Sequence, residues 1–282
     1  MIQPALSGSA LLADIELAQP RSGQVVIWWL GQSGYAIKSA SALVYIDLYL
    51  SEHLTAKYAN TEKPHIRMTE APLHGADITN AALVLASHKH SDHLDPGTLP
   101  ALFAASPGAR LMLPAALLDY AAGLGLARER LIGTRGDETL HEGGVTIHSI
   151  PSAHPVFDYS EAAGYPFLGF VLEMDGVRLY HSGDTVVYEG LAERLCGFDP
   201  DILFLPINGT DARRDALHVP PNMSSADAVT LAGQVGARLV IPHHYAMFTF
   251  NTVDVHEFTT LADMAGLNYA VLQPGARFTW PG

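Results

Sequence analysis

The chain alternates short apolar runs with turns rich in glycine, serine and proline. Early in the sequence, runs at 24–30, 35–38 and 43–47 follow one another closely, which is typical of a strand meander. Later runs of strand length alternate with helix-length segments that begin with capping residues. The pattern predicts an α/β fold with helices outside packed sheets, forming a single domain over residues 1–282.

Specific elements can be assigned from these runs. Asp95 before Pro96 is a helix-start signal, and Ser224 with Asp227 has the spacing of a capping box. The expected helices are 7–18, 96–105, 115–124, 225–235 and 255–265, with residues 49–79 mostly a long loop. The expected strands are 24–30, 35–38, 43–47, 81–86, 110–113, 139–141, 145–150, 167–174, 177–181, 202–206, 238–241, 269–272 and 277–280.

The strand expected at 81–86 leads into an unusual stretch, Ser87–Asp95, that holds three imidazoles and an internal carboxylate. Further histidine and aspartate residues lie just past the ends of three later strands. Because loops at strand ends converge in α/β sheets, these side chains are expected to form one site. The candidate residues are His88, His90, Asp92, His93, His154, Asp184 and one of the pair His243 and His244.

This set of side chains has the chemistry of a metal centre. Imidazole and carboxylate ligands suit zinc, manganese or iron at neutral pH. Two ions about 3.5–4 Å apart need roughly six or seven protein groups, which matches the candidate set. The chain has one cysteine, so a closed structural zinc site built on thiolates is excluded. We therefore predict two divalent metal ions, zinc or manganese, with iron as a further option.

Charge and composition narrow the class of partner. The formal net charge is −13, which disfavours binding to nucleic acid or to an anionic membrane surface. No apolar run approaches the roughly 20 residues of a membrane helix. Asp14 and Glu16 interrupt the first apolar stretch, so it is a poor signal peptide, and a cytoplasmic location is expected.

Several further motifs accompany the histidine cluster and identify a family. The His-x-His-x-Asp-His pattern, followed by single His, Gly-Asp and His signals, resembles the metallo-β-lactamase fold superfamily. The segments 29–35, 165–169, 180–185, 205–209, 222–223 and 241–245 resemble its L-ascorbate-6-phosphate lactonase-like branch. The similarity extends over about residues 25 to 260.

The resemblance implies a fold and a division of the ligands. The fold would be a four-layer αββα sandwich with the site at one edge. His244 is preferred to His243, and a hydroxide between the metals would attack an ester carbonyl or a phosphorus. With a single metal, Asp92 would instead act as general base. The implied ligands are His88, His90 and His154 for the first metal, Asp92, His93 and His244 for the second, and Asp184 as the bridge.

Candidates for substrate binding are basic and amide side chains. Arg67, Arg213 and Arg214 could pair with a phosphate through their guanidinium groups, although each could also lie on a solvated surface. Asn208 and Asn222 could donate to the substrate or cap turns.

Three functions follow, in order of preference. The first is a metal-dependent hydrolase that opens a lactone of a phosphorylated sugar acid, a small anionic substrate. The second is a phosphodiesterase acting on a small nucleotide or a phospholipid head group. The third is a non-catalytic or RNA-processing scaffold, which the complete ligand set and the acidic charge oppose. The resemblance also makes a homo-oligomer plausible.

Overall fold

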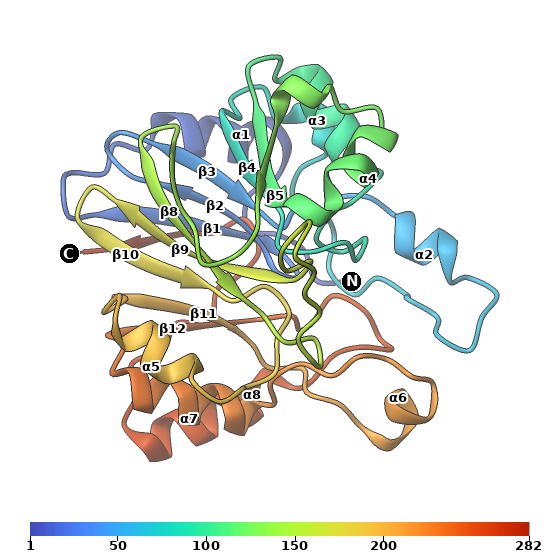
Figure 1. The fold of residues 1–282 in the computed structure, drawn as a ribbon, viewed down its shortest axis with the longest axis vertical. Coiled ribbons are helices and arrows are strands. Elements are labelled where there is room, and N and C mark those ends of the chain that lie inside the picture. Colours follow the sequence, from blue (N-terminus) through green and yellow to red (C-terminus); the bar gives the residue numbers. More distant parts are fainter. Residues whose placement is uncertain (282) are drawn as a thin grey trace.

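The computed structural model describes residues 1–281, and its two β-sheets lie face to face (Figure 1). The first sheet contains β1 (Val25–Gly31), β2 (Gly34–Lys38), β3 (Leu43–Ile46), β4 (Leu83–Leu85), β5 (Arg110–Pro114), β6 (Leu131–Thr134) and β13 (Arg277–Trp280). The second contains β7 (Thr139–Glu142), β8 (Val145–Pro151), β9 (Leu168–Met174), β10 (Val177–His181), β11 (Ile202–Pro206) and β12 (Leu239–His243). The strand orders are β13-β1-β2-β3-β4-β5-β6 and β12-β11-β10-β9-β8-β7.

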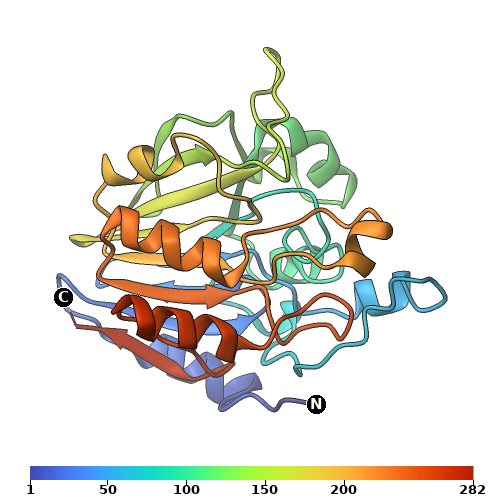
Figure 2. The same ribbon diagram turned by 90° about the horizontal axis from the view of Figure 1, so that it is seen from below.

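Helices cover the outer face of each sheet. The α-helices are α1 (Gly8–Leu17), α2 (His53–Lys57), α3 (Leu99–Ala105), α4 (Leu118–Gly123), α5 (Leu191–Cys196), α6 (Ala212–Ala216), α7 (Ser225–Val235) and α8 (Val255–Ala265). Short 3₁₀ turns lie at Gly75–Asp77, Ala115–Leu117 and Arg128–Arg130. Helices α1, α3 and α4 cover the first sheet, and α5, α7 and α8 cover the second, with α7 and α8 side by side (Figure 2). This order confirms the expected four-layer αββα sandwich.

Strand β1 shows how the sequence builds these layers. Ile27 and Trp29 pack into the core between the sheets, whereas Trp28 and Leu30 face the core under α1 and α3. Successive strand side chains point to opposite faces, so a strand buried on both faces must be apolar throughout. All seven residues of β1 are buried, which explains its uninterrupted apolar run.

Caps define the later helices as expected. The Ser224 hydroxyl accepts from the backbone N–H of Asp227, whose carboxylate accepts in turn from the N–H of Ser224, so the predicted capping box is confirmed. Asp254 accepts from the N–H of His256 at the start of α8. Gly266 ends α8 at φ 68°, a conformation that glycine adopts without a steric penalty.

Some expected elements differ in the structure. The strand expected at 269–272 is wrong, because only Tyr269 makes an isolated bridge to Val240. Helix α3 begins at Leu99 instead of Pro96, because the Asp95 carboxylate is used by the Thr98 hydroxyl at 2.5 Å and by other donors in the loop. Strand β6 and the short helices α5 and α6 were not expected from the sequence.

One end of the sandwich carries the chain excursions that matter for the site. Helices α2 and α6 project from the same end in both views (Figures 1 and 2). The two excursions are in contact there, since an Arg213 Nη2 atom of α6 lies 3.5 Å from the Glu62 carbonyl. Within residues 1–281, no helix has the length and apolar character required to cross a membrane.

Candidate metal centre

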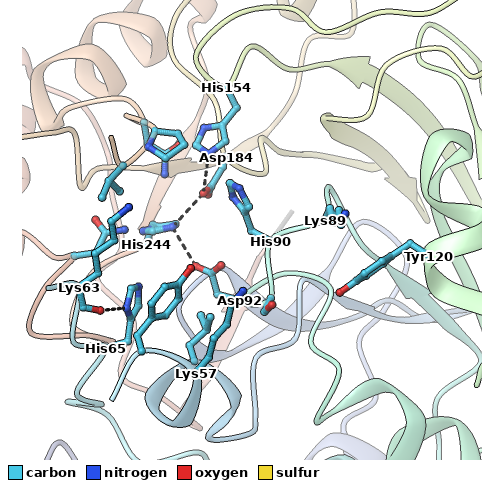
Figure 3. A pocket seen from close by; sticks show the side chains of 17 residues that line it. Lys57, Lys63, His65, Lys89, His90, Asp92, Tyr120, His154, Asp184 and His244 are labelled. Atoms are coloured by element: carbon cyan, nitrogen blue, oxygen red, sulfur yellow. Dashed lines mark hydrogen bonds and ion pairs between the residues drawn. The ribbon is translucent and has the colours of Figure 1, made fainter. Parts of the chain in front are cut away.

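Four loops from both sheets meet at this end of the molecule. Strands β10, β11 and β12 are parallel to one another, and β8 and β10 are both antiparallel to β9. The carboxyl ends of β8, β10 and β12 therefore lie at one edge, where β4 of the other sheet also ends. The loops that follow carry the candidate side chains, and His90, Asp92, His154, Asp184 and His244 converge on a common space (Figure 3).

The first cluster joins three histidines with one aspartate. The possible ligand atoms of these four residues all lie within 4.8 Å of one another. His88 Nε2 is 2.9 Å from His90 Nδ1, and the Nε2 atoms of His88 and His154 are 4.0 and 3.8 Å from Asp184 Oδ2. This arrangement matches the ligand set that the resemblance implies for the first metal.

The second cluster consists of Asp92, His93 and His244, again within 4.8 Å of one another. His244 Nε2 is 3.5 Å from Asp92 Oδ2, and His93 Nε2 is 3.8 Å from the same oxygen. The neighbouring His243 points elsewhere: its Nδ1 lies 2.9 Å from the Ser33 hydroxyl. Of the two adjacent histidines, the structure thus places His244 in the cluster.

Asp184 connects the two clusters. Its Oδ1 lies 3.2 Å from His93 Nε2, while its Oδ2 lies 3.2 Å from His244 Nε2 and also faces the first cluster. The preceding Gly183 has φ 58°, and a Cβ atom there would come within 2.6 Å of Ser87. Glycine at this position lets the Asp184 loop approach the histidine loop closely enough for one carboxylate to reach both clusters.

A buried carboxylate behind the site orients one histidine. Asp47 Oδ2 lies 2.7 Å from His93 Nδ1, and its two oxygens also accept from the N–H and hydroxyl of Ser87. The pairing leaves His93 Nε2 as the atom that faces Asp184. A carboxylate that holds the far nitrogen of a ligating imidazole is the usual support for a metal site. Sequence reasoning missed Asp47, because nothing near it in the chain carries metal-binding chemistry.

Gln32 supports the second cluster from the turn between β1 and β2. Its Nε2 donates to Asp92 Oδ2 at 2.8 Å and lies 3.1 Å from His244 Nε2. Gln32 is fully buried at φ 53°. Segment 29–35, one of those that resemble the lactonase-like branch, therefore contributes a residue to the site. Gln32 holds one oxygen of Asp92 in position.

Burial and neighbouring charges shift the histidine pKa values of the two clusters in opposite directions. Burial lowers the pKa of His88 well below its usual range and lowers the pKa of His154 to about 4. Burial acts on His244 in the same direction, but Asp184 and Asp92 raise the pKa of His244 to about 9. Burial alone would raise the pKa of Asp184, but His244 and His93 hold it well below its usual range.

The donor set fits a divalent metal ion. His93 Nε2 and Asp184 Oδ1 are buried and lack a hydrogen-bond partner within the described residues, although they are 3.2 Å apart. Buried polar atoms are normally paired, so such atoms need another partner. Two adjoining His/Asp sets suit zinc, manganese or iron. The clusters thus indicate divalent metal binding.

A cavity of about 260 Å³ opens over the two clusters. Asp92, Asp184, His90, His154 and His244 form part of its wall. The rest of the wall comes from α2 and the loop that follows it, here called the α2 excursion, from the histidine motif, from α4 and from two loops of the C-terminal half. These residues are Leu54, Lys57, Tyr58, Lys63, His65, Lys89, Ser91, Tyr120, Val219, Pro220, Asn222 and Asn251. Its three lysines, Lys57, Lys63 and Lys89, are not among the substrate-binding residues expected from the sequence.

The residues expected to bind substrate occupy different places. Asn222 lines the cavity, whereas Asn208, Arg67, Arg213 and Arg214 do not. Arg67 is buried and braces the base of α2, pairing with Glu52 at 2.7 Å and donating to the Ser51 carbonyl. Arg213 is exposed, with its guanidinium over the ring of Phe250. Asn208 accepts a hydrogen bond from Asn222, and Arg214 donates to the Asn208 carbonyl.

Comparison with known proteins relates this arrangement to a family. The profile of the beta-lactamase superfamily domain matches residues 59–245. A curated relative, "Probable L-ascorbate-6-phosphate lactonase UlaG" of Salmonella heidelberg, is 25% identical over an alignment that covers 97% of this chain and 86% of the relative.

Solved structures show the same two-sheet architecture. The isothiocyanate hydrolase from Delia radicum gut bacteria has a TM-score of 0.73 at 18% identity, covering 91% of this chain and 100% of that one. The metallo-beta-lactamase fold protein YhfI from Bacillus subtilis has a TM-score of 0.63 at 17% identity, covering 91% and 99% of the two chains.

Proposed function

This chain belongs to the metallo-β-lactamase superfamily of metal-dependent hydrolases, and from that premise we propose that it opens a lactone of a phosphorylated sugar acid. The observation that carries the proposal is the position of Asp184 between two His/Asp clusters in the wall of a cavity of about 260 Å³. This volume suits a small substrate. The lactonase name of the 25% identical relatives supports the choice of bond.

The chain's own residues would have distinct roles in the reaction. Divalent ions bound by the clusters would lower the pKa of water and polarise the substrate carbonyl. Asp184 would hold both clusters in register through its two oxygens. The Asp92 side chain is 14% exposed, compared with 4% for Asp184, and it lines the cavity. With an ion in the first cluster alone, Oδ2 of Asp92, which Gln32 orients, would be placed to accept the proton of an attacking water; with ions in both clusters, Asp92 would be a ligand of the second.

The test is a substrate panel with the purified protein loaded with manganese or with zinc. Metal content would be measured by elemental analysis. We expect hydrolysis of phosphorylated sugar lactones and little hydrolysis of bis(p-nitrophenyl) phosphate. Hydrolysis of the phosphodiester without lactone opening would overturn the proposal in favour of the phosphodiesterase alternative. Light scattering on the same sample would give the oligomeric state, for which we propose a homo-oligomer.

A further inference from the structure

The distribution of lysine in this chain is uneven. The sequence contains only four lysines against twelve arginines, and its formal net charge is −13. Three of the four, Lys57, Lys63 and Lys89, line the cavity over the two clusters. The fourth, Lys38, lies elsewhere and donates to the Ile15 and Glu16 carbonyls at the end of α1. A chain so poor in lysine has therefore placed most of it around one small cavity.

The cavity lysines are also free of carboxylate partners. Most arginines of the chain form an ion pair with a carboxylate, as Arg110 does with Glu142 and Arg277 with Asp14. Within residues 1–281, no ion pair within 4 Å and no hydrogen bond involves the Nζ atoms of the three cavity lysines. Among the described residues, the acidic side chains of the cavity wall are Asp92 and Asp184, which belong to the metal clusters. The positive charge of the wall is thus left available to a ligand.

The three lysines come from two separate segments. Lys89 stands between His88 and His90, with its Nζ 4.9 Å from the ring centre of Tyr120. Lys57 ends α2, and Lys63 lies further along the same excursion. In the view of Figure 3, Lys57 and Lys63 lie on one side of His90 and Lys89 lies on the other. An anion held over the clusters would thus face cations from more than one side.

Aromatic contacts stabilise the α2 excursion. The rings of Tyr58 and His65 stack at 4.5 Å, and His65 Nδ1 lies 2.6 Å from the Lys63 carbonyl. His65 also packs edge-on against Phe248 at 4.9 Å. These contacts tie Lys63 to the body of the protein, so its ammonium group is carried by an anchored loop. Preorganised cations bind an anion at a lower entropic cost than flexible ones.

We propose that Lys57, Lys63 and Lys89 form an anion subsite that binds the phosphate group of the substrate. The inference rests on the proposed hydrolase function and adds which residues recognise the charged end. Ammonium groups act as point charges for phosphate and do not need the planar geometry of a guanidinium. The sequence-based choice of Arg67, Arg213 and Arg214 for this task is replaced by lysines that line the cavity.

The test measures binding and is independent of turnover. The metal-loaded protein would be titrated calorimetrically with 6-phosphogluconate and with gluconate, which share the sugar-acid end and differ in the phosphate. We expect the wild type to bind the phosphorylated ligand more tightly. Lys57→Gln, Lys63→Gln and Lys89→Gln should each weaken that binding by roughly threefold to tenfold and leave gluconate binding unchanged. Lysine-to-arginine variants should retain the preference.

Arg21→Gln is the matched control. This variant removes one positive charge from an exposed side chain. Arg21 precedes β1, whereas the opposite end of that strand leads to Gln32, which contacts Asp92 in the site. Equal affinity of the wild type for both ligands, or glutamine variants that keep the full preference, would overturn the lysine subsite. Absence of lactone hydrolysis with the phosphate preference intact would instead overturn the proposed reaction, so the two failures are distinguishable.

Discussion

Arg214 Nη1 donates a hydrogen bond to Asn251 Oδ1 at 2.7 Å, and this contact sets the direction of a chain of amides. A guanidinium can only donate, so Asn251 must present its oxygen. The same oxygen accepts from Asn208 Nδ2 at 2.9 Å, and Asn208 Oδ1 accepts in turn from Asn222 Nδ2 at 3.1 Å. Oδ1 of Asn222, which lines the cavity, is left buried without a partner among the described residues.

The amide chain predicts that Asn222 accepts a hydrogen bond from a substrate hydroxyl. Asn222→Ala should raise KM about fivefold, the effect of one neutral hydrogen bond, with a smaller change in kcat. Steady-state kinetics on the lactone that the substrate panel identifies would measure both constants. An unchanged KM would show that the Asn222 oxygen does not contact the substrate.

Arg214 should affect substrate binding through Asn222. Arg214→Gln can rotate its amide, so it no longer dictates the orientation of Asn251, and KM should rise. Because the effect passes through Asn222, the double variant with Asn222→Ala should be no worse than the poorer single variant. The neighbouring Arg213→Gln is the control, since the Arg213 guanidinium contacts the Glu62 carbonyl and the Phe250 ring instead of the amide chain, and its KM should stay within about twofold of wild type. Additive effects in the double variant would contradict the coupling.

Asp47 is expected to control metal affinity without touching the metal. Asp47→Asn keeps the size and the positive φ of 47° but weakens the contact with His93 Nδ1. Loss of such a carboxylate lowers metal affinity by about 10- to 100-fold. Competition with a chelating indicator would measure it. Asp175→Asn is the matched control, because Asp175 has φ 49°, accepts from the Ser41 hydroxyl, and lies in the turn before β10, at the end of that strand opposite the one that leads to Asp184. Equal loss in both variants would argue for a general effect on folding.

The seven candidate ligands should be required for metal binding and for hydrolysis. His88→Ala removes a member of the first cluster, and Asp184→Asn removes the carboxylate shared by both. Each should abolish measurable hydrolysis, and Asp184→Asn should reduce metal content at both clusters. Elemental analysis and activity would be compared with His141→Ala, an exposed histidine of the β7 strand. Full activity and metal content in either site variant would refute the ligand assignment.

The sequence was most informative where chemistry is concentrated in a short stretch. Ser87–Asp95 carries four candidate ligands within six positions, and no packing requirement explains that density. The later ligands could be found because each comes shortly after an apolar run that forms a buried strand. The structure places all of these side chains in two adjoining clusters. The capping signals at Ser224 and Asp254 are equally local, and both helices begin where those residues predict.

The supporting residues depend on contacts that no local pattern records. Asp47 reaches His93 across 46 positions, and Gln32 reaches His244 across 212. The cavity lysines were missed for the same reason, because Lys57 and Lys63 lie in a segment whose sequence has no clear hydrophobic periodicity. The scarcity of lysine was a signal that could have been used, because four lysines with one inside the histidine motif is already unusual. The geometry of guanidinium–phosphate pairing pointed to arginines as the phosphate ligands instead. In the structure, however, Arg67 forms an ion pair with Glu52 and donates to the Ser51 carbonyl.

The protonation states of the two clusters predict that metal stoichiometry changes with pH. In the first cluster, burial lowers the pKa of His154 to about 4 and also lowers those of His88 and His90. His154 is therefore neutral above pH about 5, and burial favours the neutral form of His88 and His90, which can bind a metal without losing a proton. In the second cluster, Asp184 and Asp92 overcome the effect of burial and raise the pKa of His244 to about 9. A metal must displace that proton at any lower pH.

The affinity of the second cluster should therefore rise as pH approaches about 9, whereas that of the first should change less over the same range, because burial keeps its histidines in the neutral form. At a free metal concentration that fills only the first cluster at pH 6, we expect about one equivalent bound at pH 6 and about two at pH 9. His244→Ala should bind about one equivalent at both pH values, because it removes one of the three ligands of the second cluster. Calorimetry in two buffers of different ionisation enthalpy would count the protons released with the second ion. Two equivalents bound equally tightly at pH 6 and pH 9, without proton release, would contradict this division between the clusters.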